Sequence, residues 1–74
     1  MVKPPVFWRG TPPSLCQLCG DSVGDSFADA SIPRYGQWAM LCLDCFRDEG
    51  CKAGSGHGQV YLEQPGGKWL KVEG

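Results

Sequence analysis

The sequence is short of the residues that most enzymes place at their active sites. It contains a single histidine, His57, among 74 residues. A metal-dependent hydrolase needs additional histidines to hold a catalytic metal and to activate water. No glycine-rich loop is followed by Lys-Ser or Lys-Thr, and the segment "GSGHG" lacks the strand before it and the helix after it that a dinucleotide loop requires. We therefore expect a protein that is not an enzyme and has no small-molecule substrate.

Long apolar runs and a strong net charge are also missing. No window reaches the roughly 18 apolar residues that a membrane span needs, and four prolines in residues 4–13 interrupt the apolar core that a signal peptide needs. The formal net charge is −1. Residues 16–50 contain six acidic residues and only two basic ones, both arginines. A nucleic-acid binder normally shows a basic face. The sequence thus predicts a cytoplasmic protein that makes no membrane contact and has an acidic middle segment.

Five cysteines in so short a chain need an explanation. Disulfides are rare in a reducing cytoplasm, and a chain of this size buries only about 60% of the surface that its unfolded form exposes. Four of the cysteines form a C-x2-C-x22-C-x2-C pattern: Cys16, Cys19, Cys42 and Cys45. Two such pairs complete the tetrahedral four-sulfur shell that Zn²⁺ prefers. We predict one structural zinc ion, which would lower the formal charge to about −3 if all four sulfurs are thiolates.

Several alternatives stay open for these cysteines and for the single histidine. The same four sulfurs could form two disulfides, a dithiol redox centre or an iron site of the rubredoxin kind. Cys51 fits a small buried side chain better than a reagent. His57 is a fifth, competing candidate ligand. A closed four-sulfur shell has no open position for water or substrate, so we expect this centre to be structural.

The rest of the chain reads as an arm, two hairpins and one short helix. Residues 1–15 are predicted to be a proline-rich extended arm, and residues 16–74 a single zinc-binding domain that ends in a C-terminal hairpin. Apolar residues alternate over 26–32 and 37–41, which predicts a hairpin. Residues 44–49 fit one or two helical turns closed by a glycine. The fold class is small, metal-stabilised and mostly β, either a zinc ribbon or a treble-clef-like arrangement.

The second hairpin has a predicted register that sorts its side chains onto two faces. A three-residue loop at Pro65–Gly67 would pair Gln64 with Lys68. This register places four aliphatic residues on the inner face, namely Val60 opposite Val72 and Leu62 opposite Leu70. The outer face would then carry Tyr61, Glu63, Trp69 and Lys71.

Three segments together resemble a known group of proteins: "CQLCG", "RYGQWAMLCLDC" and "GSGHGQVY". In this order they are similar to small cysteine-rich zinc-binding proteins that bacteriophages and prophages encode. The resemblance covers residues 16 to 61. It implies a zinc-binding fold, a phage origin with a place in the host cytoplasm, and no assigned activity. It supports a role for the four paired cysteines only.

Two binding functions follow from these features. The first is a module that binds a host or phage protein, as a regulator or inhibitor, through Tyr61, Trp69, Lys71 and Trp8, because tyrosine and tryptophan are enriched where interfaces carry their energy. The alternative is a nucleic-acid-binding zinc ribbon with Tyr61 and Trp69 as stacking platforms. Lys52, Lys68 and Lys71 would then contact phosphates. Packing within the domain is the plain alternative for all of these aromatic side chains.

Overall fold

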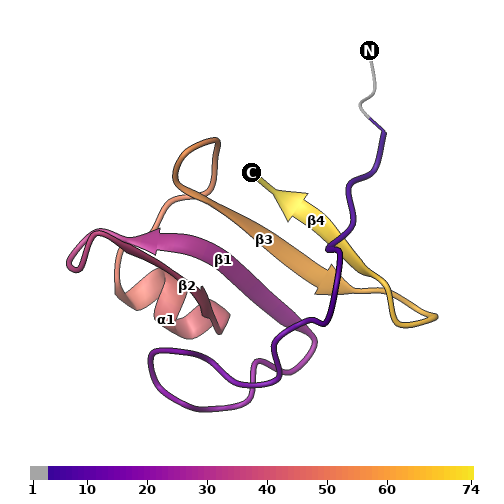
Figure 1. Ribbon diagram of the computed structural model, residues 1–74, viewed down its shortest axis with the longest axis horizontal. Coiled ribbons are helices and arrows are strands. Elements are labelled where there is room, and N and C mark those ends of the chain that lie inside the picture. The colour runs from indigo at the N-terminus through magenta and orange to yellow at the C-terminus, as the bar shows by residue number, and fades with distance from the viewer. Residues whose placement is uncertain (1–3) are drawn as a thin grey trace.

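The computed structural model describes residues 4–74, which form one antiparallel sheet with a short helix against it. The sheet has the strand order β2-β1-β3-β4. Its elements are β1 (Ser26–Ile32), β2 (Gln37–Leu41), α1 (Leu43–Asp48), β3 (Gly58–Glu63) and β4 (Trp69–Glu73). Figure 1 shows α1 beside β1 and β2 at one end of the sheet. The small, mostly β fold predicted from the sequence is therefore confirmed.

The first hairpin and the helix lie where the sequence placed them. The strands β1 and β2 match the predicted ranges 26–32 and 37–41. The helix begins one residue earlier than predicted and ends one residue earlier. Its end is a Schellman motif, because Gly50 N–H donates to the Arg47 carbonyl at 3.1 Å and Cys51 N–H to the Phe46 carbonyl at 3.1 Å. Gly50 has a φ of 70°, which explains why a glycine stands there.

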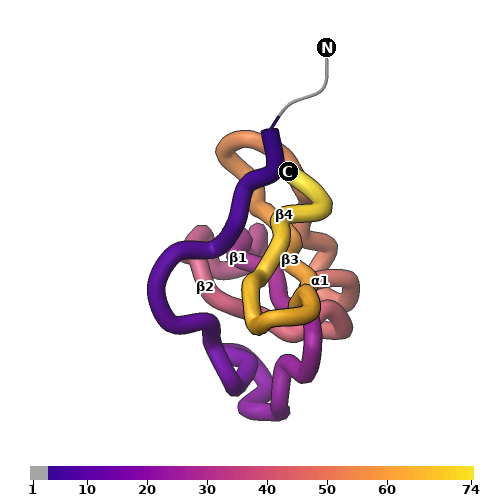
Figure 2. Tube along the Cα trace, turned by 90° about the vertical axis from the view of Figure 1, so that its right-hand side faces the viewer, coloured from indigo at the N-terminus to yellow at the C-terminus, as the bar shows by residue number. Residues whose placement is uncertain are grey.

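The proline-rich arm adds a short strand to the outer edge of β4. Trp8 N–H donates to the Trp69 carbonyl, and Lys71 N–H donates to the Val6 carbonyl, each at 2.8 Å. Phe7 therefore pairs with Leu70 in an antiparallel bridge. Figure 2 shows the arm running beside β4. The first three residues of the predicted arm lie outside the described part of the chain.

The predicted register of the second hairpin is confirmed near its loop and wrong at its far end. Leu62 pairs with Leu70, and Gln64 N–H donates to the Lys68 carbonyl at 2.6 Å. Val60, however, pairs with Glu73 and not with Val72, because the register shifts between Val60 and Tyr61. An extra residue in one strand of an antiparallel pair is a β-bulge, which periodic side-chain alternation does not reveal.

The prediction of which hairpin face points inward is wrong for the aromatic residues. Tyr61 is only 7% exposed and Trp69 only 8%, whereas Leu62 is 37% and Val72 is 44% exposed. Phe27 of β1 explains the difference, since its ring centroid lies 5.1 Å from that of Tyr61 and 5.3 Å from that of Trp69. Aromatic side chains bury more apolar area than aliphatic ones. The aromatic face of this hairpin therefore belongs to the core. Of the predicted inner face, Val60 is buried as expected, at 3% exposed.

Trp8 of the arm completes this aromatic cluster. Its ring meets those of Phe27 and Tyr61 edge-on, each at a centroid distance of 5.3 Å. The indole N–H is bonded to the Thr11 carbonyl at 3.3 Å. The arm thus covers one face of the sheet at β3 and β4, while α1 packs against β1 and β2. No helix within residues 4–74 is long and apolar enough to cross a membrane.

Candidate metal centre

Two chain segments bring the four paired cysteines together. Cys42 directly follows β2 and is the N-cap of α1, so Cys45 lies in the first helical turn, as the treble-clef-like expectation required. Cys16 and Cys19 lie on a tight turn in which Gly20 N–H donates to the Cys16 carbonyl at 3.0 Å. The four sulfur atoms all lie within 4.8 Å of one another. The structure therefore joins all four predicted ligands in one cluster.

Gln17 fixes the first cysteine pair against the free edge of β2. Its backbone N–H donates to the Met40 carbonyl at 2.9 Å, and its side-chain Oε1 accepts from Met40 N–H at 2.7 Å. Met40 is two residues before Cys42, so these two bonds bring the first cysteine turn to the start of the second. The sequence analysis did not predict this role of Gln17. The C-x-x-C spacing identifies the two ligands, but it does not show that a residue between them bonds to a strand.

The sulfur positions fit a tetrahedral zinc ion. A Zn–S distance of about 2.3 Å corresponds to sulfur–sulfur separations of about 3.8 Å in a regular tetrahedron. The sulfur atoms of Cys19 and Cys42 are 3.8 Å apart. All five cysteines are free, and this separation is much longer than the sulfur–sulfur bond of a disulfide. The cluster is suited to one zinc ion.

Backbone hydrogen bonds prepare the first turn to carry negative charge. Leu18 N–H and Cys19 N–H point at the Cys16 sulfur, at 3.4 and 3.5 Å. Burial disfavours the Cys16 thiolate, but hydrogen bonds from the backbone of Cys19, Cys42 and Leu18 outweigh it and lower the pKa of Cys16 to about 6. Burial, followed by the neighbouring sulfurs, raises the pKa of Cys45. Bound Zn²⁺ would supply the positive charge that lets all four sulfurs be thiolates together.

Cys51 and His57 lie outside the sulfur cluster. Among residues 4–74 the group of side chains placed to share a metal contains the four paired cysteines and neither of these two. Cys51 is half-buried against the hydrophobic core. Burial and the charge of Glu49 raise the pKa of its thiol, so the neutral form is favoured. His57 is exposed in the glycine-rich loop before β3.

The predicted partner-binding residues do not form an exposed surface. Tyr61 and Trp69 are buried and Trp8 is half-buried on the aromatic cluster. Lys71 is half-buried, and its ammonium group donates to the Gly74 carbonyl at 3.3 Å. The lysines of the nucleic-acid alternative are separated as well, because Lys68 lies over the ring of Phe7 while Lys52 lines a pocket elsewhere. The expected aromatic stacking platform is therefore absent from the described surface.

A different surface, which we call the apolar face, is left open on the other side of the second hairpin. It consists of Phe7, Leu62, Leu70 and Val72. Leu70 pairs with Leu62 on one side and with Phe7 on the other, so these side chains share one face of three adjacent strands. The helix α1 contacts neither β3 nor β4. Alternation in the sequence did not identify this face as the outer one, because both faces of the hairpin carry apolar residues.

Comparison with known proteins gives one informative likeness over part of the chain. No family model matches, and no solved structure matches. The LIM domain transcription factor LMO4-A of Xenopus laevis is 43% identical over 37 residues, which are 50% of this chain and 20% of that protein. This chain therefore matches only a fifth of that relative's length. The likeness and the sulfur cluster together support a zinc-binding module. The resemblance to phage-encoded proteins is not tested by these comparisons and stays a prediction.

Proposed function

We propose that this protein is a non-catalytic zinc-binding module that docks onto another protein through its apolar face. The observation that carries the proposal is the exposure of Leu62, Val72 and Phe7, next to the half-buried Leu70, on a sheet whose opposite side is filled by aromatic rings. An apolar patch with no cover from its own chain is typical of a protein-interaction site. The closed four-sulfur shell supports a structural role for the metal.

A cationic group at the border of the apolar face and the partial likeness to a LIM domain protein both support a binding role. Lys68 lies 5.6 Å from the centroid of the Phe7 ring, so a cationic group borders the apolar face. Polar rims around an apolar centre are characteristic of protein interfaces. The partial likeness to a LIM domain transcription factor supports binding to other macromolecules over catalysis. The resemblance to phage-encoded proteins makes a host or phage protein the expected partner.

A nucleic-acid function has less support. Stacking on bases needs exposed rings, but Tyr61 and Trp69 are buried. The net charge of −1 gives no general attraction to phosphates. A partner that binds through apolar contacts is the better match to the surface that the fold leaves open.

The test is affinity capture from the producing cell with wild-type and altered proteins. The change Leu62→Ser with Val72→Ser should reduce the amount of captured protein at least tenfold, since both side chains lie on the apolar face. Leu15→Ser is the matched control, because Leu15 is 57% exposed but lies outside this face. All variants should keep one zinc per chain. Equal capture by the double variant and wild type, or equal loss with Leu15→Ser, would contradict the proposal. A steep loss of binding with salt would indicate nucleic acid instead.

A further inference from the structure

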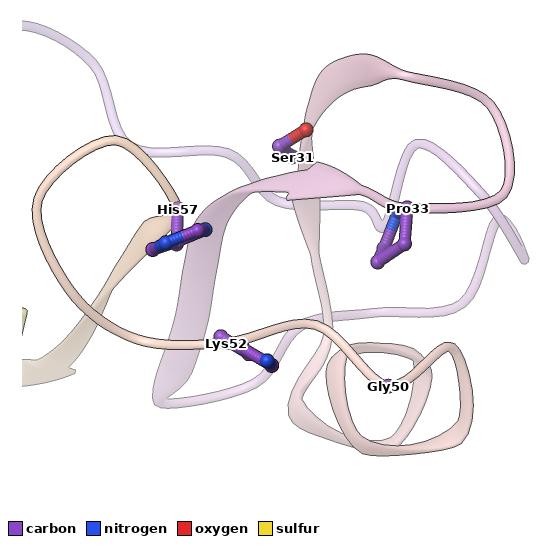
Figure 3. A pocket seen from close by; sticks show the side chains of 5 residues that line it. All are labelled: Ser31, Pro33, Gly50, Lys52 and His57. Atoms are coloured by element: carbon purple, nitrogen blue, oxygen red, sulfur yellow. The ribbon is translucent and has the colours of Figure 1, made fainter.

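An open surface pocket lies between the first hairpin and the glycine-rich loop. Its volume is about 420 Å³, and its lining residues are Ser31, Pro33, Gly50, Lys52 and His57. They come from three segments: the end of β1 with its turn, the residues after α1, and the loop before β3. Figure 3 shows His57, Lys52, Pro33 and Ser31 placed around this hollow. Neither the metal centre nor the apolar face uses any of these residues.

Backbone hydrogen bonds fix the lining segments relative to one another. Ser31 N–H donates to the His57 carbonyl at 2.9 Å, which ties the loop to β1. His57 N–H and Gly58 N–H both donate to the Gly54 carbonyl, at 3.0 and 2.9 Å, and close the loop into a tight turn. Because these bonds hold the loop against β1, the backbone of Ser31 and that of His57 keep a fixed spacing.

Gly58 allows the third segment, which contains Lys52, to pack closely against β1 and β3 beside the pocket. A Cβ atom at Gly58 would lie 2.6 Å from the Ala30 Cβ and 2.9 Å from the Lys52 carbonyl oxygen. Only a glycine permits this close approach. The pocket is thus preorganised by main-chain packing, which lowers the entropic cost of binding a ligand.

The charge around the pocket favours an anion. No acidic side chain lines it, while Lys52 and His57 do. Glu49 precedes the lining residue Gly50, but its carboxylate is bonded to Arg34 at 2.8 Å, which compensates its charge. Within residues 4–74, the side chains of Ser31, Lys52 and His57 make no hydrogen bond or ion pair with the protein. One hydroxyl, one ammonium and one imidazole therefore stay free to donate to a ligand.

From this arrangement we propose that the pocket binds a small organic phosphate monoester. Lysine is a common phosphate ligand, and an imidazole N–H is a further hydrogen-bond donor. The Lys52 ammonium, the His57 imidazole and the Ser31 hydroxyl are three donor groups, which match the three terminal oxygens of a phosphate monoester better than the two oxygens of a carboxylate. The volume leaves room for an organic group beside the phosphate, and the rings of Pro33 and His57 offer it apolar contact.

The experiment is a titration of the zinc-loaded full chain, followed by amide chemical shifts at constant ionic strength. Phenyl phosphate should cause saturable shifts at Ser31, Lys52 and His57. Inorganic phosphate should bind more weakly because it lacks the ring, and benzoate more weakly because it has a single charge. Lys52→Gln with His57→Gln should weaken phenyl phosphate binding at least tenfold. Lys68→Gln is the matched control, since it removes the same charge outside the pocket.

The proposal is tested by comparing the binding of each ligand to the wild-type protein and to each variant. Absence of saturable shifts at the pocket would overturn the proposal, as would equal weakening by the Lys68 control. Tight binding of a single-stranded oligonucleotide without binding of phenyl phosphate would also overturn it and point to a nucleic acid. Zinc content and thermal unfolding of each variant show whether a loss of binding comes from a loss of fold. Loss of the pocket's ligand leaves the proposed protein interaction at the apolar face unaffected, so the two proposals are tested separately.

Discussion

Gln17 and Met40 exchange two hydrogen bonds, one through the main chain of both residues and one from Met40 N–H to the Gln17 side chain. Gln17 sits inside the first cysteine pair, and Met40 sits just before the second. The free edge of β2 is thus used to bring together two metal-binding turns that are far apart in sequence. A residue between two ligands therefore helps to place both cysteine pairs.

This relationship leads to a prediction about zinc affinity. Gln17→Ala removes the acceptor for Met40 N–H, and the loss of one such bond costs about 1 kcal/mol, or roughly a fivefold change in an equilibrium constant. We expect zinc to be released at a correspondingly lower concentration of a competing chelator. Gln17→Glu is the matched control, because a carboxylate oxygen still accepts this bond. Equal zinc affinity for Gln17→Ala and wild type would show that the side-chain bond is not needed for assembly.

Removal of zinc should unfold the domain. Structural zinc sites contribute an apparent binding free energy of about 10–16 kcal/mol, whereas a chain of this length has a net stability of only about 4–11 kcal/mol. Addition of a strong chelator is therefore expected to abolish the near-UV circular dichroism of the aromatic cluster and to collapse the amide dispersion. Return of both signals on adding zinc is the control for reversibility. A metal-free sample with native spectra would contradict the structural role of the metal.

The cysteine outside the cluster and the histidine should be dispensable for metal binding. Cys51→Ser and His57→Ala are expected to retain one zinc per chain, because the four-sulfur shell excludes both residues. Cys16→Ser should lose zinc or misfold, since it removes the sulfur that accepts two backbone N–H groups. Native mass spectrometry gives the zinc content directly. Substoichiometric zinc in His57→Ala alone would show that the ligand set is wrong.

The tryptophans should differ sharply in their effect on stability. Trp69→Ala removes a side chain that is only 8% exposed and packs beside Phe27, and such truncations cost about 3–5 kcal/mol. Trp38→Ala is the matched control, because Trp38 is 51% exposed and should change the free energy of unfolding much less. Denaturant unfolding of the zinc-loaded proteins measures both. Similar losses for the two variants would contradict the assignment of the aromatic face to the core.

Gly58→Ala should destabilise the fold through a steric contact. The added methyl group would lie 2.6 Å from the Ala30 Cβ, and overpacking of this kind costs about 1–3 kcal/mol. Combining it with Ala30→Gly should restore part of the loss, because one of the two clashing groups is removed. Thermal unfolding of the single and double variants tests this. If the double variant shows no recovery beyond the cost of Ala30→Gly measured alone, the remaining close contacts, with the Lys52 carbonyl oxygen at 2.9 Å and the Ala30 Cα at 3.1 Å, account for the loss.

Local patterns in the sequence were sufficient for the metal ligands and for most of the elements. The spacing of the four cysteines identified the zinc site, because two C-x-x-C turns supply the four sulfurs of a tetrahedral zinc shell. Alternating apolar residues located β1 and β2, and Gly50 marked the end of α1. These features depend on neighbours within a few positions of the chain, so a single sequence displays them.

The tertiary structure alone decided which face of the second hairpin became the core. Both faces carry apolar residues, and alternation cannot rank them. The choice depended on Phe27, which pairs with Tyr61 across the sheet, and on Trp8, which the arm brings over both rings. The hydrogen bonds between Gln17 and Met40 could not be predicted from local patterns either, because the two residues are far apart in the sequence. Contacts between distant segments depend on the packed geometry of the whole chain, and this geometry left the apolar face open and placed Lys52 beside His57.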